Sequence, residues 1–258
     1  MPRITLVMPY YNEARFIEAT LASLMAQEAR DFRLVLIDNG STDGSEAIAR
    51  AVCRNAGMTD VVFLSEPKPG KLHALMTGLA MIETEFVATL DADTNYPPGY
   101  VSRCLALFDA NPRASSVMAI DLYDPADSAR GLAQRRRVAF AARMFRAKCH
   151  TGAYGQAFRT AAYRASGGYD IDRWPYVLED HELIYRIMWT GPSVYDRDHF
   201  CFPSDRRSDR GNVNWTLLDQ IAYLLVPKCL LSAYFNRYLG PRLERRGLRN
   251  INLREQNW

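Results

Sequence analysis

The stretch Phe86-Val87-Ala88-Thr89-Leu90-Asp91-Ala92-Asp93 decides how this chain of 258 residues is organised. Its first five residues form a short apolar run, which is typical of a strand buried on both faces. Strands of this kind belong to parallel sheets covered by helices, and ligands bind such sheets beyond the carboxyl ends of the strands. The stretch therefore predicts an α/β fold with Asp91 and Asp93 at its ligand-binding edge.

Similar apolar runs alternate with helical patterns along the first half of the chain. The sequence predicts strands over 4–8, 34–37, 61–64, 86–90 and 115–120, and helices over 16–27, 44–55, 71–82 and 98–110. This alternation implies right-handed crossovers and a parallel sheet. The predicted ligand-binding loops are the segments that follow the strands, namely 9–13, 38–43, 66–71 and 91–95.

The second half of the chain is less regular. Helices are expected over 129–150, 160–165 and 180–190, and strands over 154–158 and 193–202. Residues 215 to about 246 have an amphipathic helical pattern, with breaks expected near Pro227 and at Gly240-Pro241. We therefore expect an α/β domain over 1–210, divided near residue 120, and an amphipathic, basic helical tail over 211–258.

Composition and charge exclude several classes of protein. Glycine and proline are near average usage, which excludes fibrous and low-complexity chains. Five cysteines without a C-x-x-C pair favour reduced thiols in a cytoplasmic protein over a disulfide framework or a zinc site. No secretory leader is evident, and the longest apolar segment, 221–235, is interrupted by Pro227-Lys228, so a single-span membrane anchor is not expected.

The net charge of +3 conceals an asymmetry between the two halves. Residues 1–129 hold 10 Lys and Arg against 17 Asp and Glu, whereas residues 130–258 hold 22 against 12. An acidic first half suggests a cation site, and a basic second half suggests an anionic partner.

The pair Asp91 and Asp93 is the candidate cation site. Two carboxylates at a strand end can share a hard divalent cation and leave coordination positions for phosphate oxygens and water. An Asp-rich turn without a ligand is the alternative, and we interpret the pairs at 170/172 and 196/198 in that way. Only Asp91 and Asp93 directly follow a buried strand.

Two further loops carry candidate ligand-binding residues. In Asp38-Asn39-Gly40-Ser41-Thr42-Asp43-Gly44, turn formation and helix capping account for Ser41–Asp43, whereas Asp38 and Asn39 could read a nucleobase edge. Gly70-Lys71 opens a helix, where free amides and a cation suit phosphate. The loop lacks the rest of the G-x-x-x-x-G-K-[ST] motif and is therefore not a P-loop.

Glu179-Asp180 stands before the helical pattern 182–188. N-capping of that helix by Asp180 is the local explanation. A buried carboxylate that faces a metal and a diphosphate would instead suit a general base acting on a hydroxyl.

Together these motifs resemble those of family 2 glycosyltransferases in order and spacing, over roughly residues 3–210. The resemblance is carried by Val7–Glu13, 38–44, Gly70-Lys71, Asp91–Asp93, and Gly167-Gly168-Tyr169 with Glu179-Asp180. It implies a GT-A fold, a Rossmann-like, mostly parallel sheet flanked by helices, here with a C-terminal helical appendage. It also implies an inverting enzyme that moves one sugar from a UDP-, dTDP- or GDP-linked donor to an acceptor hydroxyl. Residues 1–120 would bind the nucleotide sugar, and residues 121–210 the acceptor.

The resemblance also implies roles for residues on the nucleotide side. Pro9 and Tyr11 would line the base and ribose pocket, Glu13 and Asn39 would contact the nucleoside, and Lys71 would lie beside it. Many relatives have aspartate where this chain has Asn39. An amide both donates and accepts, so Asn39 would still suit a uracil, thymine or guanine edge.

On the metal side, the resemblance implies that Asp91 and Ala92 approach the ribose and the donor. Asp93, together with Asp91, would hold Mg²⁺ or Mn²⁺ on the diphosphate, and Asp180 would be the catalytic base. His199 is a candidate third metal ligand, although a lone histidine in an apolar strand is more often structural.

The acceptor is expected on the basic side of the molecule. The Q-x-x-R-W motif and the membrane helices of processive synthases are absent, which favours a single addition. The arginines of 129–150 and of the tail are either solvated helix faces or a contact with an anionic membrane. We therefore expect a lipid-linked or glycolipid acceptor of cell-envelope glycan synthesis, reached from the cytoplasmic face of the membrane, and no nucleic acid. Arg206-Arg207 would close over the diphosphate.

Two other functions compete with sugar transfer. A sugar-1-phosphate nucleotidyltransferase should have a Gly-rich loop with Arg or Lys after its first strand, and Pro9–Glu13 is a different loop. A non-catalytic protein that binds nucleotide sugars would keep the donor pocket and release no nucleoside diphosphate. A glycoside hydrolase would need two opposed carboxylates and no nucleotide pocket.

Overall fold

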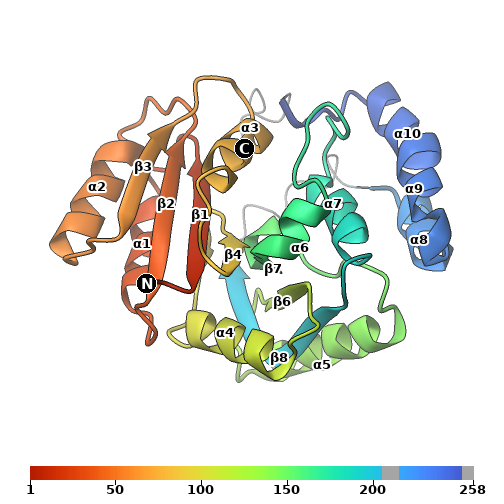
Figure 1. Ribbon diagram of the computed structural model, residues 1–258, viewed down its shortest axis with the longest axis horizontal. Helices are drawn as coiled ribbons and strands as arrows, with labels where there is room; N and C mark the ends of the chain where they lie inside the picture. The colour runs from red at the N-terminus through yellow and green to blue at the C-terminus, as the bar shows by residue number, and fades with distance from the viewer. Residues whose placement is uncertain (205–214, 252–258) are drawn as a thin grey trace.

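A computed structural model describes residues 1–204 and 215–251, and these form a twisted eight-stranded sheet with helices on both faces (Figure 1). The strands are β1 (Ile4–Tyr10), β2 (Phe32–Asp38), β3 (Val61–Ser65), β4 (Phe86–Thr89), β5 (Thr94–Asn95), β6 (Ser116–Asp121), β7 (Gln156–Arg159) and β8 (Ser193–Pro203). The predicted division at 210/211 and the Arg206-Arg207 pair lie outside the described residues.

The sheet has the order β3-β2-β1-β4-β7-β6-β8-β5. The strands β3, β2, β1 and β4 are parallel, as the sequence predicts. Beyond them β7 is antiparallel to both β4 and β6, β8 is parallel to β6, and β5 is antiparallel to β8. The strand over 61–65 is only half-buried, contrary to the prediction, because β3 lies at the edge of the sheet.

Alternate residues of the central strands build two separate cores, one on each face of the sheet. Leu6 and Met8 of β1 pack with α1 (Ile17–Met25), α2 (Ser45–Asn55) and α4 (Tyr100–Ala110). On the opposite face, Val7 of β1 packs with α3 (Lys71–Leu79), α6 (Thr160–Ala165) and α7 (Glu179–Ile187). The arginine-rich α5 (Ala129–Met144) rests on β6 and β8 through a smaller cluster around Val138.

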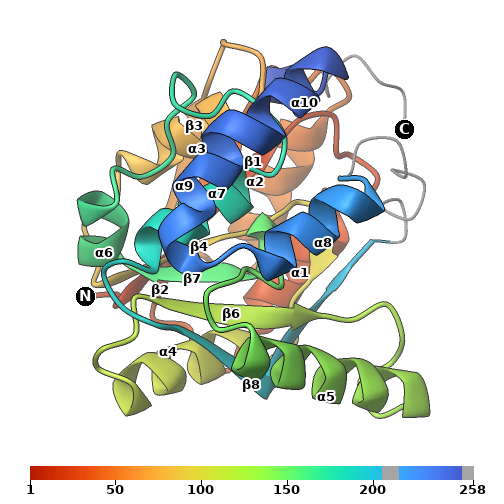
Figure 2. The same cartoon turned by 90° about the vertical axis from the view of Figure 1, so that its right-hand side faces the viewer.

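The C-terminal helices pack against the start of α7 (Figure 2). They are α8 (Leu217–Leu225), α9 (Leu231–Ala233), a π-helical turn (Tyr234–Leu239) and α10 (Gly240–Arg245), and shorter 3₁₀ turns occur at Ala153–Gly155 and Lys228–Leu230. The expected break near Pro227 is confirmed. No helix of the described residues is long and apolar enough to cross a membrane.

Two of the predicted helix ends are wrong. The helix runs through Gly240-Pro241 without a break, because the π-helical turn just before it widens the backbone where a proline would otherwise clash with a carbonyl four residues earlier. The arginine-rich helix ends at Met144 and not at His150. The backbone leaves the helical conformation at Phe145, which has a ψ of 58°, and further on Cys149 donates its N–H to the Tyr223 hydroxyl of α8 at 2.9 Å.

Candidate active site

The loops after β1 and β2 meet at the carboxyl edge of the sheet and are tied together. Asn12, in the left-handed region at φ 52°, donates its N–H to Ser41 Oγ and accepts from the Thr42 N–H. The next two amides, of Glu13 and Ala14, donate to Ser45 Oγ and Asp43 Oδ2, each at 2.8 Å. The interpretation of Ser41–Asp43 as turn-forming residues is therefore confirmed. The expected capping of the next helix by their side chains is wrong, because Gly44 is the N-cap residue of α2 and no side chain caps that helix.

The residues predicted to hold the nucleoside lie at this edge. Pro9 is buried near the end of β1, and Tyr11 and Glu13 are half-buried in the loop that follows it. Their contacts with a nucleoside stay a prediction.

Asn39 organises the neighbouring loop. Its side-chain Nδ2 donates to the carbonyls of Glu66 and Lys68, both at 2.8 Å, and its Oδ1 accepts the Gly70 N–H at 2.9 Å. The residue is buried, and both amide hydrogens are used by the protein. Asn39 therefore holds the backbone of 66–70, which an aspartate could not do because a carboxylate has no hydrogen to donate.

Lys71 and Asp91 form an ion pair, 2.5 Å from Nζ to Oδ1, between the start of α3 and the end of β4. The Asp91 backbone N–H donates to the Tyr96 hydroxyl, which in turn donates to the Tyr154 carbonyl. These contacts fix Asp91 at the edge of the sheet. Ala92 beside it is buried, and its carbonyl accepts a hydrogen bond from Thr20 of α1.

The start of α3 is less open to phosphate than the sequence suggests. The side-chain oxygen of Asn250, near the end of the described chain, accepts the Leu72 N–H at 3.3 Å. One of the amides predicted to be free is therefore occupied by the protein itself. Gly70, the residue before α3, has a φ of 125°, a backbone conformation that residues other than glycine rarely adopt.

Asp93 is buried next to the end of β8. Its Oδ2 accepts a hydrogen bond of 2.9 Å from the Ser204 hydroxyl, and its carbonyl accepts the Ser204 N–H. Carboxylates and a hydroxyl are oxygen donors of the kind that Mg²⁺ and Mn²⁺ prefer. The donor set therefore fits a divalent cation.

His199 does not belong to this set. It is fully buried against the ring of Tyr100, at 4.7 Å between centroids, and burial lowers its pKa to about 3. Among residues 1–204 and 215–251, no group of three or more His, Cys, Asp and Glu side chains could hold a metal ion. The structural interpretation of His199, which the sequence favours over metal binding, is therefore confirmed, because the β8 strand directs the ring into the core.

Glu179 and Asp180 begin α7, directly after Leu178, which is held at φ 65° in the left-handed region. Leu178 is the N-cap residue and no side chain caps the helix, so the alternative of capping by Asp180 is wrong. Asp180 Oδ1 instead accepts two hydrogen bonds from His181, from its N–H at 2.8 Å and from its ring Nδ1 at 2.9 Å.

The two adjacent carboxylates have opposite pKa shifts. Burial raises the pKa of Glu179 to about 7, and the charge of Asp180 adds to this effect. Burial also acts to raise the pKa of Asp180, but the charge and hydrogen bonds of His181, together with Lys71, lower it below its usual range. Lys71 acts to lower the pKa of both carboxylates and Asp91 to raise that of Glu179, so the start of α7 lies within electrostatic reach of the Lys71–Asp91 pair.

Three residues of this region were not predicted from the sequence. The His181 ring meets Trp215 edge-on at 4.8 Å and Tyr223 at 5.9 Å between centroids. Trp215 and Tyr223 come from the tail, which the sequence predicts only as an appendage. The one local signal was a histidine directly after Glu179-Asp180.

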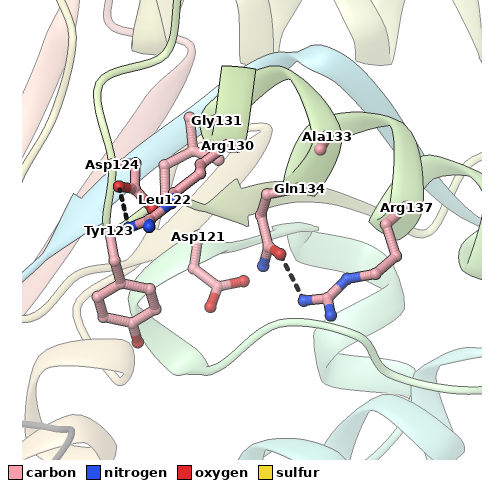
Figure 3. Close-up of a pocket in the computed structure, with 9 residues that line it drawn as sticks. All are labelled: Asp121, Leu122, Tyr123, Asp124, Arg130, Gly131, Ala133, Gln134 and Arg137. Carbon is pink, nitrogen blue, oxygen red and sulfur yellow. Dashed lines mark hydrogen bonds and ion pairs between the residues drawn. The ribbon is translucent and has the colours of Figure 1, made fainter. Parts of the chain in front are cut away.

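A pocket of about 530 Å³, lined by both charged and apolar residues, opens at the carboxyl end of β6 (Figure 3). Its walls come from the residues after β6 and from the first turns of α5. Arg130 forms an ion pair with Asp124, and Arg137 donates to the Gln134 side chain. Asp121 lies between Tyr123 on one side and Gln134 with Arg137 on the other.

Comparison with known proteins identifies the family. The model of glycosyl transferase family 2 matches residues 5–166, which is more than half of the chain, and the chain therefore belongs to this family. Its fold is the GT-A fold: it superposes on the mannosyltransferase PcManGT of Pyrobaculum calidifontis with a TM-score of 0.70, at 22% identity over 94% of this chain and 68% of that one. The TarS protein of S. aureus gives a TM-score of 0.63 at 16% identity, over 92% of this chain and 74% of that one.

Curated relatives are similar over part of their length. The undecaprenyl-phosphate 4-deoxy-4-formamido-L-arabinose transferase of Edwardsiella ictaluri is 31% identical over 41% of this chain and 34% of its own. The succinoglycan biosynthesis protein ExoA of Rhizobium meliloti is 29% identical over 75% of this chain and 60% of its own. The chain thus matches about a third of the former relative and three fifths of the latter.

Proposed function

We propose that this protein is an inverting glycosyltransferase that moves one sugar from a nucleotide-diphosphate sugar to an acceptor hydroxyl. The observation that carries the proposal is the Lys71–Asp91 ion pair after β4, with the half-buried Glu179 and the buried Asp180 within electrostatic reach of Lys71. A cation and a carboxylate beside the leaving group, opposite a second carboxylate, suit the departure of a diphosphate and the deprotonation of a hydroxyl.

The donor side is proposed to bind a UDP-, dTDP- or GDP-linked sugar through Pro9, Tyr11, Glu13, Asn39, Lys71, Asp91 and Ala92. Asp93, with Asp91, would hold Mg²⁺ or Mn²⁺, which when bound neutralises charge on the departing diphosphate. The PcManGT structure holds GDP-Man and Mn²⁺, and a TarS structure holds UDP-GlcNAc. Both support a nucleotide sugar and leave the base open.

Asp180 is proposed to take the proton of the acceptor hydroxyl as that oxygen attacks the anomeric carbon. The contacts with His181 keep Asp180 ionised and fix one of its oxygens, which leaves the other for the acceptor. Asp180 is buried, and holding donor and acceptor in line would contribute much of the rate.

The acceptor is proposed to be lipid-linked and to be met at the face of a membrane with anionic lipids, in cell-envelope glycan synthesis. The pocket at the end of β6 lies on the same sheet edge as Asp91 and has both carboxylates and guanidinium groups, which suits a sugar or phosphate headgroup. Relatives named as undecaprenyl-phosphate transferases support this class of acceptor.

A donor screen tests the proposal. The protein is incubated with UDP-, dTDP- and GDP-sugars, with Mn²⁺, Mg²⁺ or EDTA, with and without bacterial membrane lipid extract, and nucleoside diphosphate release is measured. We expect release from one nucleotide class that EDTA abolishes and lipid extract accelerates. Binding without release would instead support the non-catalytic alternative. Formation of nucleoside triphosphate from a nucleotide sugar when pyrophosphate is added would support the nucleotidyltransferase. If no nucleotide sugar binds, the proposal fails.

A further inference from the structure

The helix α8 exposes its apolar face. Its exposed large apolar residues stand at positions i, i+1, i+4, i+7 and i+8, a spacing that places them on one side of the helix. These residues are Leu217, Leu218, Ile221, Leu224 and Leu225, and their side chains are between 38% and 77% exposed. A surface helix normally turns such a stripe toward the core, and here Asp219 and Tyr223 take that place.

The orientation of α8 is fixed by polar contacts on its inner side. Asp219 is completely buried, forms a capping box with Thr216, and accepts a hydrogen bond of 2.8 Å from Arg242 Nε. The Tyr223 hydroxyl accepts the Cys149 N–H at 2.9 Å. Turning the leucines inward would strip a buried carboxylate of its partners, which is strongly destabilising. The outward apolar face is therefore built into the fold.

A basic and apolar segment lies next to α8. Lys148 Nζ donates to the Val226 carbonyl at the end of α8, which fixes the end of α5 beside it. Just before Lys148, residues 143–146 are all exposed, and their sequence is Arg-Met-Phe-Arg. No acidic residue occurs between Asp127 and Asp170, so the sequence around residues 143–146 is strongly basic.

We infer that the leucine face of α8 and residues 143–146 form one docking surface, the α8 surface, for a bilayer that contains anionic lipids. Leucine, methionine and phenylalanine side chains enter the boundary of the acyl chains, while Arg143 and Arg146 meet lipid phosphates. A second copy of the chain is a poorer occupant because it would bring the same arginines against them. The inference rests on the proposed function, since it supplies the surface from which a lipid-linked acceptor is reached.

The α8 surface lies across one helix from the candidate base. On the inner side of α8, the Tyr223 ring packs against His181, which holds Asp180. Figure 2 shows α8 at the outside of the molecule and α7 behind the C-terminal helices. A membrane bound to the α8 surface would therefore present its headgroups near the acceptor side of the site.

Cys229 permits a direct test with the natural sequence. It is exposed next to the end of α8, whereas Cys53, Cys104, Cys149 and Cys201 are buried. Labelled at Cys229 with an environment-sensitive fluorophore, the full chain is mixed with vesicles of phosphatidylcholine alone or with phosphatidylglycerol. We expect a blue shift and co-sedimentation with the anionic vesicles only, both weakened by high salt.

Matched variants locate the surface. The double variant Leu218→Gln/Leu225→Gln should lower affinity for anionic vesicles by roughly tenfold or more, because each leucine contributes apolar burial. Arg143→Gln/Arg146→Gln should weaken binding to anionic vesicles through lost charge. Met81→Gln changes an apolar residue after α3 that is 48% exposed and lies outside the α8 surface, and it should bind as the wild type does. Unchanged thermal unfolding of each variant shows that the fold is kept.

Several outcomes would overturn the inference. They are the absence of wild-type binding to anionic vesicles, undiminished binding by Leu218→Gln/Leu225→Gln, and a protein dimer in solution that this variant dissociates. Nucleotide-sugar binding is measured in parallel and should be the same in wild type and variant. If the wild type binds anionic vesicles but no nucleotide sugar, the proposed function is wrong and the docking surface is still supported.

Discussion

Two opposing effects act on the pKa of Asp180: burial raises it, and the contacts with His181 lower it. If it is the general base, Asp180→Asn should lower the rate of transfer by roughly a hundredfold or more, the usual contribution of such a group, with donor affinity unchanged. Single-turnover kinetics and calorimetric donor binding would measure the two effects. Transfer at the wild-type rate would remove Asp180 from that role.

The ionisation of Glu179 should make the free energy of unfolding depend on pH. Because its pKa is raised in the folded protein, its favourable contribution is present at acidic pH and is lost as the pH rises through about 7. Glu179→Gln should therefore be more stable than the wild type above that pH, by about 1–3 kcal/mol, and similar to it near pH 4.

Urea unfolding at a series of pH values would measure this difference. Glu18→Gln, at an exposed position of α1, is the control and should follow the wild type. Parallel stability curves for Glu179→Gln and the wild type would contradict the raised pKa.

The variant Asn39→Asp distinguishes two roles for this side chain, contact with a nucleobase and support of the loop 66–70. Asn39→Asp loses both donated hydrogen bonds and sets a carboxylate against the Glu66 and Lys68 carbonyls. We expect a loss of stability of about 1–3 kcal/mol, measured by urea unfolding, and a higher KM for the donor. Asn55→Asp on the exposed end of α2 should cost little. A stable variant with altered base preference would favour base reading instead.

At the scale of elements, the close approach of α3 to the sheet depends on Gly78. A Cβ there would stand 2.5 Å from Ile37 Cδ1 and 2.7 Å from Val7 Cγ1. Gly78→Ala should therefore destabilise the protein by about 1–3 kcal/mol, although alanine favours a helix.

Chemical unfolding would measure that loss. The double variant Gly78→Ala/Ile37→Val removes the clashing Cδ1 and should recover part of the stability. If the double variant is less stable than the sum of the two single variants predicts, α3 does not meet the sheet at this point.

At the scale of the molecule, residues 248–250 join the two sides of the candidate site. The Leu248 carbonyl accepts the Val177 N–H, and the Asn250 N–H donates to the Pro175 carbonyl, which places this segment beside the chain that leads into Glu179. The Asn250 side chain reaches the start of α3 through Leu72. One segment thus contacts both the donor side and the loop before the candidate base.

Asn250→Ala should remove this connection. Loss of the acceptor for Leu72 costs about 1 kcal/mol of stability, and we expect kcat to fall as the start of α3 loses its support. Asn250→Asp keeps the acceptor oxygen and should restore both. Thermal unfolding and steady-state kinetics of the two variants are the measurements, and equal behaviour of both would show that this hydrogen bond has no role.

The sequence by itself determined the order of strands and helices in the first half, the loop in which Asp91 and Asp93 lie, and the helix that begins near Glu179-Asp180. It could do so because apolar periodicity and the carboxyl ends of parallel strands are local features of the chain. The tertiary structure alone decided that Asn39 serves a loop, that His199 enters the core, that His181 meets Tyr223, and that the leucines of α8 face outward. These outcomes depend on contacts between segments that are far apart in the sequence. The periodicity of a single segment carries no information about such contacts.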